Sequence, residues 1–185
     1  MQSQRHKISQ EIPLILYFIA FIWGVFIIDR FLPLEDFGLV PRSVTHLPGI
    51  VAMPFLHNDL SHIVGNSTPL LFLMTLLAGS KANSKIIVFA IILLGGTLLW
   101  LFGRSDAIHI GASGLVFGLA TFLIVSGILE KRPIPFIISI LVALIYGSSI
   151  LTGILPLQTG VSWDGHLSGA IAGAIIAWTA LRFWR

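Results

Sequence analysis

Long apolar stretches with almost no charge are the feature of this sequence that most restricts its fold. Six occur, each close to the roughly 20 residues that a helix needs to cross a bilayer. They cover residues 13–32, 59–78, 86–102, 113–129, 134–155 and 165–184. Backbone N–H and C=O groups find no water in lipid, so each stretch must be helical. We therefore predict an all-α, polytopic membrane protein with a bundle of six transmembrane helices.

The connections between these stretches leave no room for a separate soluble domain. Only 10% of the 185 residues are charged, against about a quarter in soluble domains. We expect residues 1–185 to form a single membrane domain, with a cytoplasmic N-terminal segment at residues 1–12 and a long outer loop at residues 33–58. The absence of cysteine excludes disulfides, thiolate metal sites and a cysteine nucleophile.

The distribution of lysine and arginine predicts the orientation, because cytoplasmic segments carry the excess of both. With the N-terminus inside, eight of the eleven fall inside, namely Arg5, Lys7, Lys81, Lys85, Lys131, Arg132, Arg182 and Arg185. The outer segments hold Arg30, Arg42 and Arg104. Both termini are therefore expected in the cytoplasm, and we expect the protein in a bacterial inner (cell) membrane. The net charge of +3 comes from few, scattered residues and does not indicate a nucleic-acid partner.

Polar and ionisable groups within membrane-spanning stretches are functional suspects by default. Three stretches carry such groups near their outer ends, so these groups can meet in one site. His62 and Asn66 are four residues apart and share one helix face. Two donors aimed at one point suit the stabilisation of a developing negative charge. Alternatively, Asn66 only holds neighbouring helices together, as buried amides do in membranes.

Ser113 stands between two glycines where a loop passes into a helix. A helix N-terminus offers free N–H groups and a positive dipole end, which favour an oxyanion at that position. An N-cap serine flanked by packing glycines would give the same pattern.

His166 opens the last stretch and is followed by a stripe of small residues. The stripe comprises Gly165, Gly169 and Gly173, and a matching stripe after Ser113 comprises Gly114 and Gly118. Small residues at this spacing let helix backbones approach closely. Packing of the two stripes would bring the Ser113 hydroxyl within hydrogen-bond distance of His166, as a nucleophile and its base require. An interfacial histidine on a packing helix is the alternative interpretation.

No acid completes a triad in this pattern. Asp164 lies two residues before His166 and points away from the imidazole on a helix. Asp59 and Asp106 stand at the edges of stretches. The sequence thus predicts a serine–histidine dyad.

Two further histidines were considered for other roles. His109 lies near the mouth of the site but is a poor alternative base, because it belongs to a loop. His57 and His62 are five residues apart and do not align on one helix, and no clear further ligand accompanies them. We therefore expect neither a metal nor a cofactor.

Three motifs, in this order, resemble the rhomboid family of intramembrane serine proteases. They are His57-x4-His62-x3-Asn66, Gly111-x-Ser113-Gly114 and His166-x2-Gly169-x3-Gly173. The resemblance covers the whole transmembrane core.

The resemblance implies that Ser113 is the nucleophile and His166 the general base. It implies an oxyanion hole from His62, Asn66 and the backbone N–H groups around Ala112. Residues with structural roles near the site would be His57, which shapes the outer loop, together with Gly111, Gly114, Phe117 and Gly169. Substrates would be other membrane proteins, cut in or near a transmembrane segment and admitted laterally past the fifth helix and the outer loop.

Two departures from the family pattern affect the outer loop and the histidine. Many rhomboids carry Trp-Arg in the first loop, which here contains no tryptophan. A tyrosine often stacks on the histidine, and here Phe117 occupies that position. An inactive rhomboid-like protein that binds membrane clients is the alternative function, although such relatives generally lack the serine or the histidine. A small transporter would require broken helices in paired halves, which we do not find.

Overall fold

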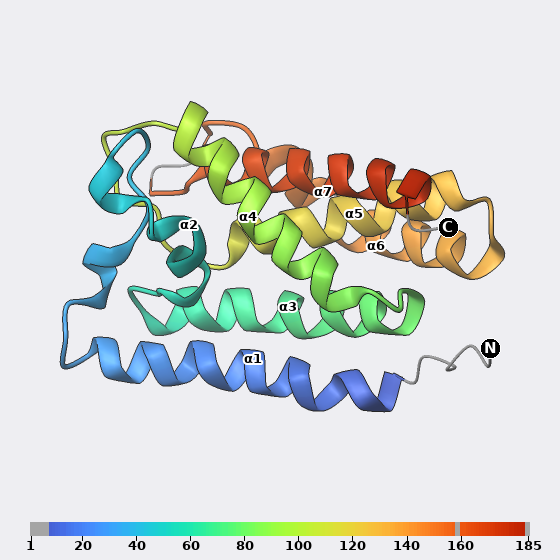
Figure 1. Ribbon diagram of the computed structural model, residues 1–185, viewed down its shortest axis with the longest axis horizontal. Helices are drawn as coiled ribbons and strands as arrows, with labels where there is room; N and C mark the ends of the chain where they lie inside the picture. Colours follow the sequence, from blue (N-terminus) through green and yellow to red (C-terminus); the bar gives the residue numbers. More distant parts are fainter. Residues whose placement is uncertain (1–7, 158–159, 184–185) are drawn as a thin grey trace.

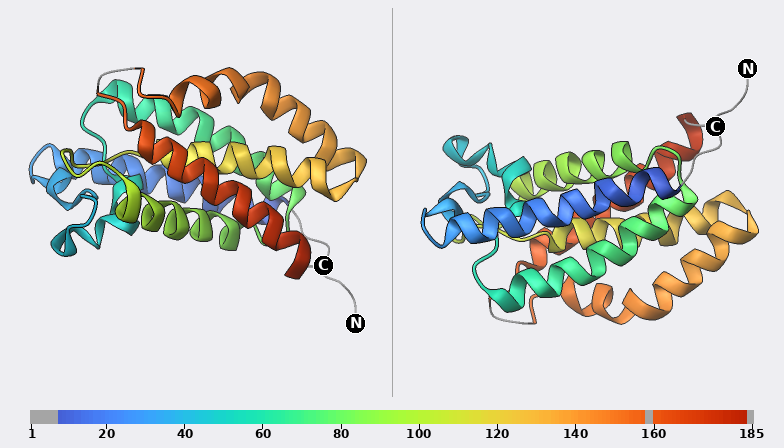
Figure 2. Two further views of the ribbon diagram at one scale, coloured as in Figure 1. Left: turned by 90° about the horizontal axis from the view of Figure 1, so that it is seen from above. Right: turned by 90° about the horizontal axis from the view of Figure 1, so that it is seen from below.

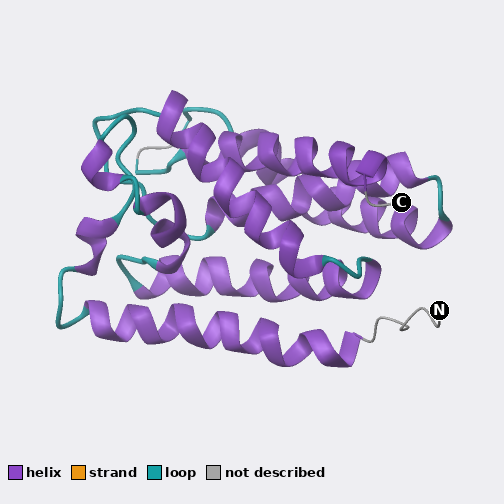
Figure 3. Cartoon of the chain, in the orientation of Figure 1, coloured by secondary structure: helices purple, strands orange, loops and turns teal. Residues whose placement is uncertain are grey.

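The computed structural model describes residues 8–157 and 160–183, and within these ranges the chain is helical without a named strand (Figure 3). The α-helices are α1 (Ile8–Asp29), α2 (Gly49–Ala52), α3 (Leu60–Ser80), α4 (Ser84–Phe102), α5 (Ser113–Glu130), α6 (Pro133–Gly153) and α7 (Trp163–Phe183). Three short 3-10 helices lie in the outer loop, η1 (Leu34–Phe37), η2 (Val44–His46) and η3 (Met53–Phe55). The prediction of an all-α protein is confirmed.

Five helices in the described part of the chain are long and apolar enough to cross a membrane: α1, α3, α4, α5 and α6. The sixth predicted stretch forms α7, which has 21 residues but carries Asp164 and Arg182 in its end turns. Its predicted last residue, 184, lies outside the described residues. By length and apolar composition alone, five of the six predicted spans are therefore found.

The long helices run side by side along one direction (Figures 1 and 2). The first turn of α1 and the last turn of α7 lie at one end of the bundle (Figure 1). The loops that precede α3, α5 and α7 gather at the opposite end, which we call the outer end (Figure 1). Helix α5 packs most extensively on α7 and then on α6, with smaller contacts to α3 and α4, whereas α6 rests mainly on α5 and barely touches α3.

The start of α1 corrects one prediction. Residues 8–12 were expected in a segment before the first helix, but α1 already begins at Ile8; residues 1–7 lie outside the described part. Glu11 is buried in this first turn, and its carboxylate accepts a hydrogen bond from the Ser84 hydroxyl at 2.9 Å. The Lys85 ammonium lies 3.9 Å from the same carboxylate. These contacts with α4, and an acid near a helix N-terminus, favour the early helix start.

The outer loop is fixed to the end of α4. Arg42 has a φ of 62°, and its guanidinium donates to the carbonyl oxygen of Gly103 at 2.7 Å. Its backbone N–H donates to the Trp100 carbonyl at 2.9 Å. The Trp100 indole in turn donates to the Ser43 carbonyl at 3.0 Å. Arg42 of the loop and Trp100 of α4 thus anchor this loop, which has no tryptophan of its own.

Candidate active site

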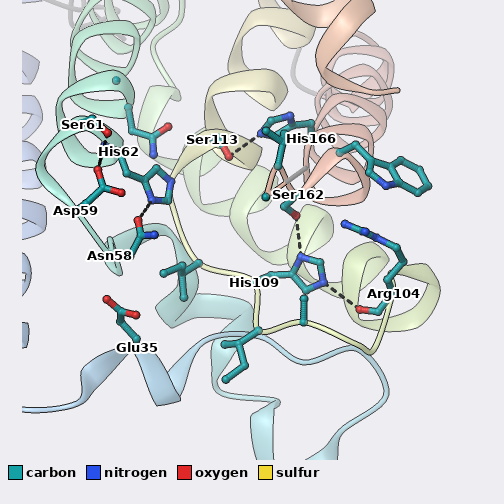
Figure 4. A pocket seen from close by; sticks show the side chains of 18 of the residues that line it. Glu35, Asn58, Asp59, Ser61, His62, Arg104, His109, Ser113, Ser162 and His166 are labelled. Atoms are coloured by element: carbon teal, nitrogen blue, oxygen red, sulfur yellow. Dashed lines mark hydrogen bonds between the residues drawn. The ribbon is translucent and has the colours of Figure 1, made fainter. Parts of the chain in front are cut away.

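The Ser113 hydroxyl lies 2.9 Å from Nε2 of His166 at the outer end of the bundle (Figure 4). Ser113 is the first residue of α5, and His166 lies in the first turn of α7. The other ring nitrogen of His166, Nδ1, donates to the Gly153 carbonyl at 2.9 Å. Because a carbonyl only accepts, Nδ1 carries the proton and Nε2 is free to accept from Ser113. This is the tautomer that a general base requires.

The imidazole is also held by an aromatic ring. Phe117, one turn after Ser113, stacks on His166 with ring centroids 4.1 Å apart and an interplanar angle of 11°. Gly153, the last residue of α6, packs against both rings: a Cβ there would lie 2.5 Å from Cζ of Phe117 and 3.3 Å from His166 Nδ1. Gly153 is a site residue that sequence reasoning missed, because a single glycine at a helix end carries no distinguishing signal.

The glycine stripes of α5 and α7 face each other. A Cβ on Gly169 would overlap the Gly114 carbonyl oxygen, and one on Gly173 would overlap that of Gly118. From the other side, a Cβ on Gly118 would come within 3.0 Å of the Gly169 carbonyl oxygen. The two backbones are therefore as close as the stripes predict, and this contact sets the spacing of Ser113 and His166.

His62 and Asn66 converge on Gly111, two residues before Ser113. A Cβ on Gly111 would strike the His62 ring and lie 3.4 Å from the Asn66 amide nitrogen. The φ of Gly111 is +104°, which side-chain-bearing residues rarely adopt. Gly111 thus lets two side chains of α3 reach the backbone that leads into Ser113. Ala112 lies between Gly111 and Ser113 in the sequence and is fully buried. The N–H groups of the first turn of α5, which have no partner within the helix, follow directly after it.

His57 orients the Asn66 side chain. It is fully buried in the loop before α3, and its Nε2 lies 3.1 Å from Asn66 Nδ2. Burial, with a smaller effect from the neighbouring His62, lowers the pKa of His57 to about 4. The ring is therefore neutral near pH 7, and Nε2 accepts from the amide. One amide hydrogen is bound in this way and the second is left for the site.

His62 has a partner on its other side. Its Nδ1 donates to the side-chain oxygen of Asn58 at 2.8 Å (Figure 4). Asp59 caps α3, since its carboxylate accepts from the His62 backbone N–H at 2.8 Å and from Ser61 at 2.6 Å. The two hydrogen bonds of His62, to Asn58 and Asp59, hold the start of α3 against the site.

Four residues form a second polar group beside the dyad, which we call the outer clasp: Arg104, His109, Ser162 and Asp164. Figure 4 labels the first three. Asp164 is 5% exposed and accepts from the backbone N–H of Arg104 at 2.8 Å. As predicted, it makes no hydrogen bond to the imidazole of His166. His109 is 3% exposed and bonds to Ser162 rather than to Ser113.

A cavity of about 900 Å³ connects the outer loops with the dyad. Ser113, His166, His62 and Asn66 all line it. The site therefore has room for a peptide segment and for water.

Comparison with known proteins identifies the family of the chain. The model of the Rhomboid domain matches residues 41–183. Uncharacterized proteins of Mycobacterium tuberculosis and Mycobacterium bovis are each 39% identical to the chain over 175 residues, which is 89% of this chain and 72% of the relative. An uncharacterized protein of Mycobacterium leprae is 38% identical over 177 residues, which is 89% of this chain and 69% of the relative. With most of its length matched by the domain and by these relatives, this chain belongs to the rhomboid family.

Proposed function

We propose that the protein is an intramembrane serine endopeptidase that cuts transmembrane segments of other membrane proteins. The observation that carries the proposal is the pairing of the Ser113 hydroxyl with the unprotonated Nε2 of His166 at 2.9 Å. Membership of a family whose members are generally serine proteases supports it. The dyad needs no metal or cofactor.

The proposal includes six membrane spans within one domain, residues 1–185. Helix α7 serves as the sixth span, since its 21 residues reach about 30 Å and it packs on α4 and α5. The start of α1 and the end of α7 lie at the same end of the bundle, which fits two cytoplasmic termini (Figure 1). The excess of lysine and arginine at that end, and the bacterial relatives, favour the inner membrane.

The reaction is acyl transfer. The Ser113 oxygen attacks the carbonyl carbon of the scissile peptide bond while His166 Nε2 takes the hydroxyl proton. When the tetrahedral intermediate collapses, the C–N bond breaks and His166 returns the proton to the leaving amine. A water molecule then gives a proton to His166 and attacks the carbonyl carbon of the acyl-enzyme. The ester bond to Ser113 breaks, His166 returns the proton to the Ser113 oxygen, and the new carboxyl end is released.

The oxyanion is held near Gly111. Asn66 contributes its free amide hydrogen, and the backbone N–H groups after Ala112 contribute the positive end of α5. His62 adds a donor from Nε2 when both of its ring nitrogens carry protons, because Nδ1–H is held by Asn58.

Substrate access fits the loose packing of α6. Between α3 and α6 the pairing of the Phe72 and Tyr146 rings, with centroids 6.2 Å apart, is one of few contacts. Lateral displacement of α6 would open the bundle to a substrate helix. That helix must unwind locally before its carbonyl carbon can be attacked, so small or helix-breaking residues near the cut are expected.

The test is cleavage of a model transmembrane substrate by the purified protein in liposomes, beside Ser113→Ala and His166→Ala. Both variants should lose activity by about 10³-fold or more, with no labelling of Ser113→Ala by a fluorophosphonate. Ser61→Ala is the matched control, because Ser61 lines the same cavity but contacts Asp59. If wild type binds substrates yet neither cleaves them nor reacts with the fluorophosphonate, the protein is the inactive, client-binding kind of rhomboid.

A further inference from the structure

The outer clasp contains the most heavily bonded acid in the described part of the chain. Besides the Arg104 backbone N–H, the Asp164 carboxylate lies 3.4 Å from both Nε and Nη2 of the Arg104 guanidinium. It also accepts from the backbone N–H of Gly165 at 3.2 Å. The Ser162 hydroxyl lies 3.3 Å from the same carboxylate. A buried carboxylate is costly unless it is paired, so these contacts are needed to keep Asp164 inside.

His109 and Ser162 continue this network. Nε2–H of His109 donates to the Arg104 carbonyl at 3.0 Å. In the neutral ring Nδ1 therefore accepts, and the Ser162 hydroxyl donates to it at 2.7 Å. The Ser162 oxygen accepts from the backbone N–H of Gly165 at 3.3 Å, which makes Ser162 the N-cap of α7.

Serine, histidine and aspartate in one network resemble a second catalytic triad, but the geometry is wrong for one. His109 Nε2 is bound to a backbone carbonyl, and its distance to the Asp164 carboxylate is 3.8 Å. The side-chain donors of α3 converge beside Ser113, not beside Ser162. The network therefore fits a mechanical role better than a chemical one.

The position of the clasp in the chain indicates what that role is. Arg104 and His109 belong to the loop of residues 103–112, which ends at Ser113. Ser162 and Asp164 begin the helix that carries His166. The clasp thus ties the segment before Ser113 to the start of the helix that carries His166.

We propose that Asp164 is a positioning residue, which fixes the distance between Ser113 Oγ and His166 Nε2 by tying loop 103–112 to the start of α7. This inference rests on the proposed protease function. Asp164 touches neither the reacting atoms nor the substrate. Its loss would leave the Arg104 N–H groups unpaired and free the loop, and a misplacement of about 1 Å near reacting groups costs about 10²-fold in rate.

The experiment compares Asp164→Asn with Asp106→Asn, each in the full-length protein in liposomes. Asp106→Asn removes the same charge, but Asp106 is an exposed residue at the wall of the cavity and lies outside the clasp. We expect Asp164→Asn to lower kcat and the rate of fluorophosphonate reaction with Ser113 by about tenfold or more, with KM within about twofold of wild type. Asp106→Asn should match wild type in kcat, in KM and in the rate of fluorophosphonate reaction. Assays run well below the measured Tm of each variant, so that unfolding does not mimic the effect.

Hydrogen–deuterium exchange tests the clasp without relying on activity. Asp164→Asn should speed exchange in residues 104–112 and 163–166, and Asp106→Asn should not. If wild type is active and Asp164→Asn has the same kinetics and the same exchange as wild type, the positioning role is overturned. Fluorophosphonate labelling of Ser162 instead of Ser113 would overturn it too, since the network would then be nucleophilic. A wild type without cleavage or labelling would contradict the proposed function, while the exchange result would still decide the clasp.

Discussion

The Nδ1–H of His166 donates to the carbonyl oxygen of Gly153, which belongs to the last turn of α6. The base is thereby oriented by a helix other than its own, in the role that an acid plays in a serine–histidine–aspartate triad. A backbone carbonyl fixes the tautomer without adding a buried charge. The same contact makes the imidazole sensitive to the position of α6.

Substitution of Gly153 by alanine should therefore impair the reaction more than it impairs stability. The added Cβ would press on the Phe117 ring and on His166 Nδ1, and we expect kcat to fall by about tenfold or more. Gly147→Ala is the control on the same helix, because a Cβ there meets nothing within 4 Å. Equal kcat values for the two variants in the liposome assay would contradict the role given to Gly153.

Gly169→Ala should act on the fold itself. Its Cβ would overlap the Gly114 carbonyl oxygen, so α5 and α7 must separate, at an expected cost of about 2 kcal/mol or more in the free energy of unfolding. Gly24→Ala in α1, where a Cβ has open space, should be neutral or slightly stabilising. Denaturation in detergent micelles, followed by circular dichroism, compares the two. A Gly169→Ala protein as stable as Gly24→Ala would show that the helices are not held so close.

Asn66→Asp should lower kcat by about 10² to 10³-fold, the usual cost of losing one oxyanion donor. Aspartate keeps the shape of the side chain but has no N–H to donate. Thr68→Val, also isosteric and on an exposed part of α3, should retain wild-type activity. Steady-state cleavage kinetics distinguish this role from a purely helix-bridging one, in which Asn66→Asp would lower stability while kcat stayed near the wild-type value.

Acid should destabilise the protein through His57. Its pKa is about 4 in the folded protein, below the ordinary 6.5, so the unfolded chain binds the proton more tightly. Stability from this residue is complete above about pH 6.5 and is lost as the pH falls toward 4, by about 3 kcal/mol in all. His57→Gln keeps an acceptor for Asn66 but does not titrate. The free energy of unfolding, measured from pH 7 to 4, should fall less steeply for this variant; parallel curves would contradict the prediction.

The helices and the proximity of Ser113 to His166 could be predicted because lipid leaves few alternatives. Only helices satisfy the backbone in a bilayer, and polar residues such as Asn66 and His166 stand out in apolar stretches. The matched spacing of Gly114 with Gly118 and of Gly169 with Gly173 predicted which two helices pack closely.

The contacts made by loops could not be predicted in the same way. The bonds from Arg104 to Asp164 and from His109 to Ser162 join positions 60 and 53 apart in the sequence, and no periodicity relates them. Asp164 was correctly placed away from the imidazole, but its burial depends on Arg104, whose position follows from the loop. The start of α1 was misplaced for a similar reason, because Glu11 is held by Ser84 on another helix.

The order of residues in the chain has a consequence for synthesis. Ser113 and the oxyanion residues of α3 leave the ribosome before His166, and α5 keeps its glycine face uncovered until α7 has been inserted beside it. The nascent chain therefore holds Ser113 without His166 while translation covers the 53 positions that separate the two residues. Under the proposed function, the chain becomes competent only as its last described helix docks, so incomplete chains would be harmless to the membrane proteins made alongside them.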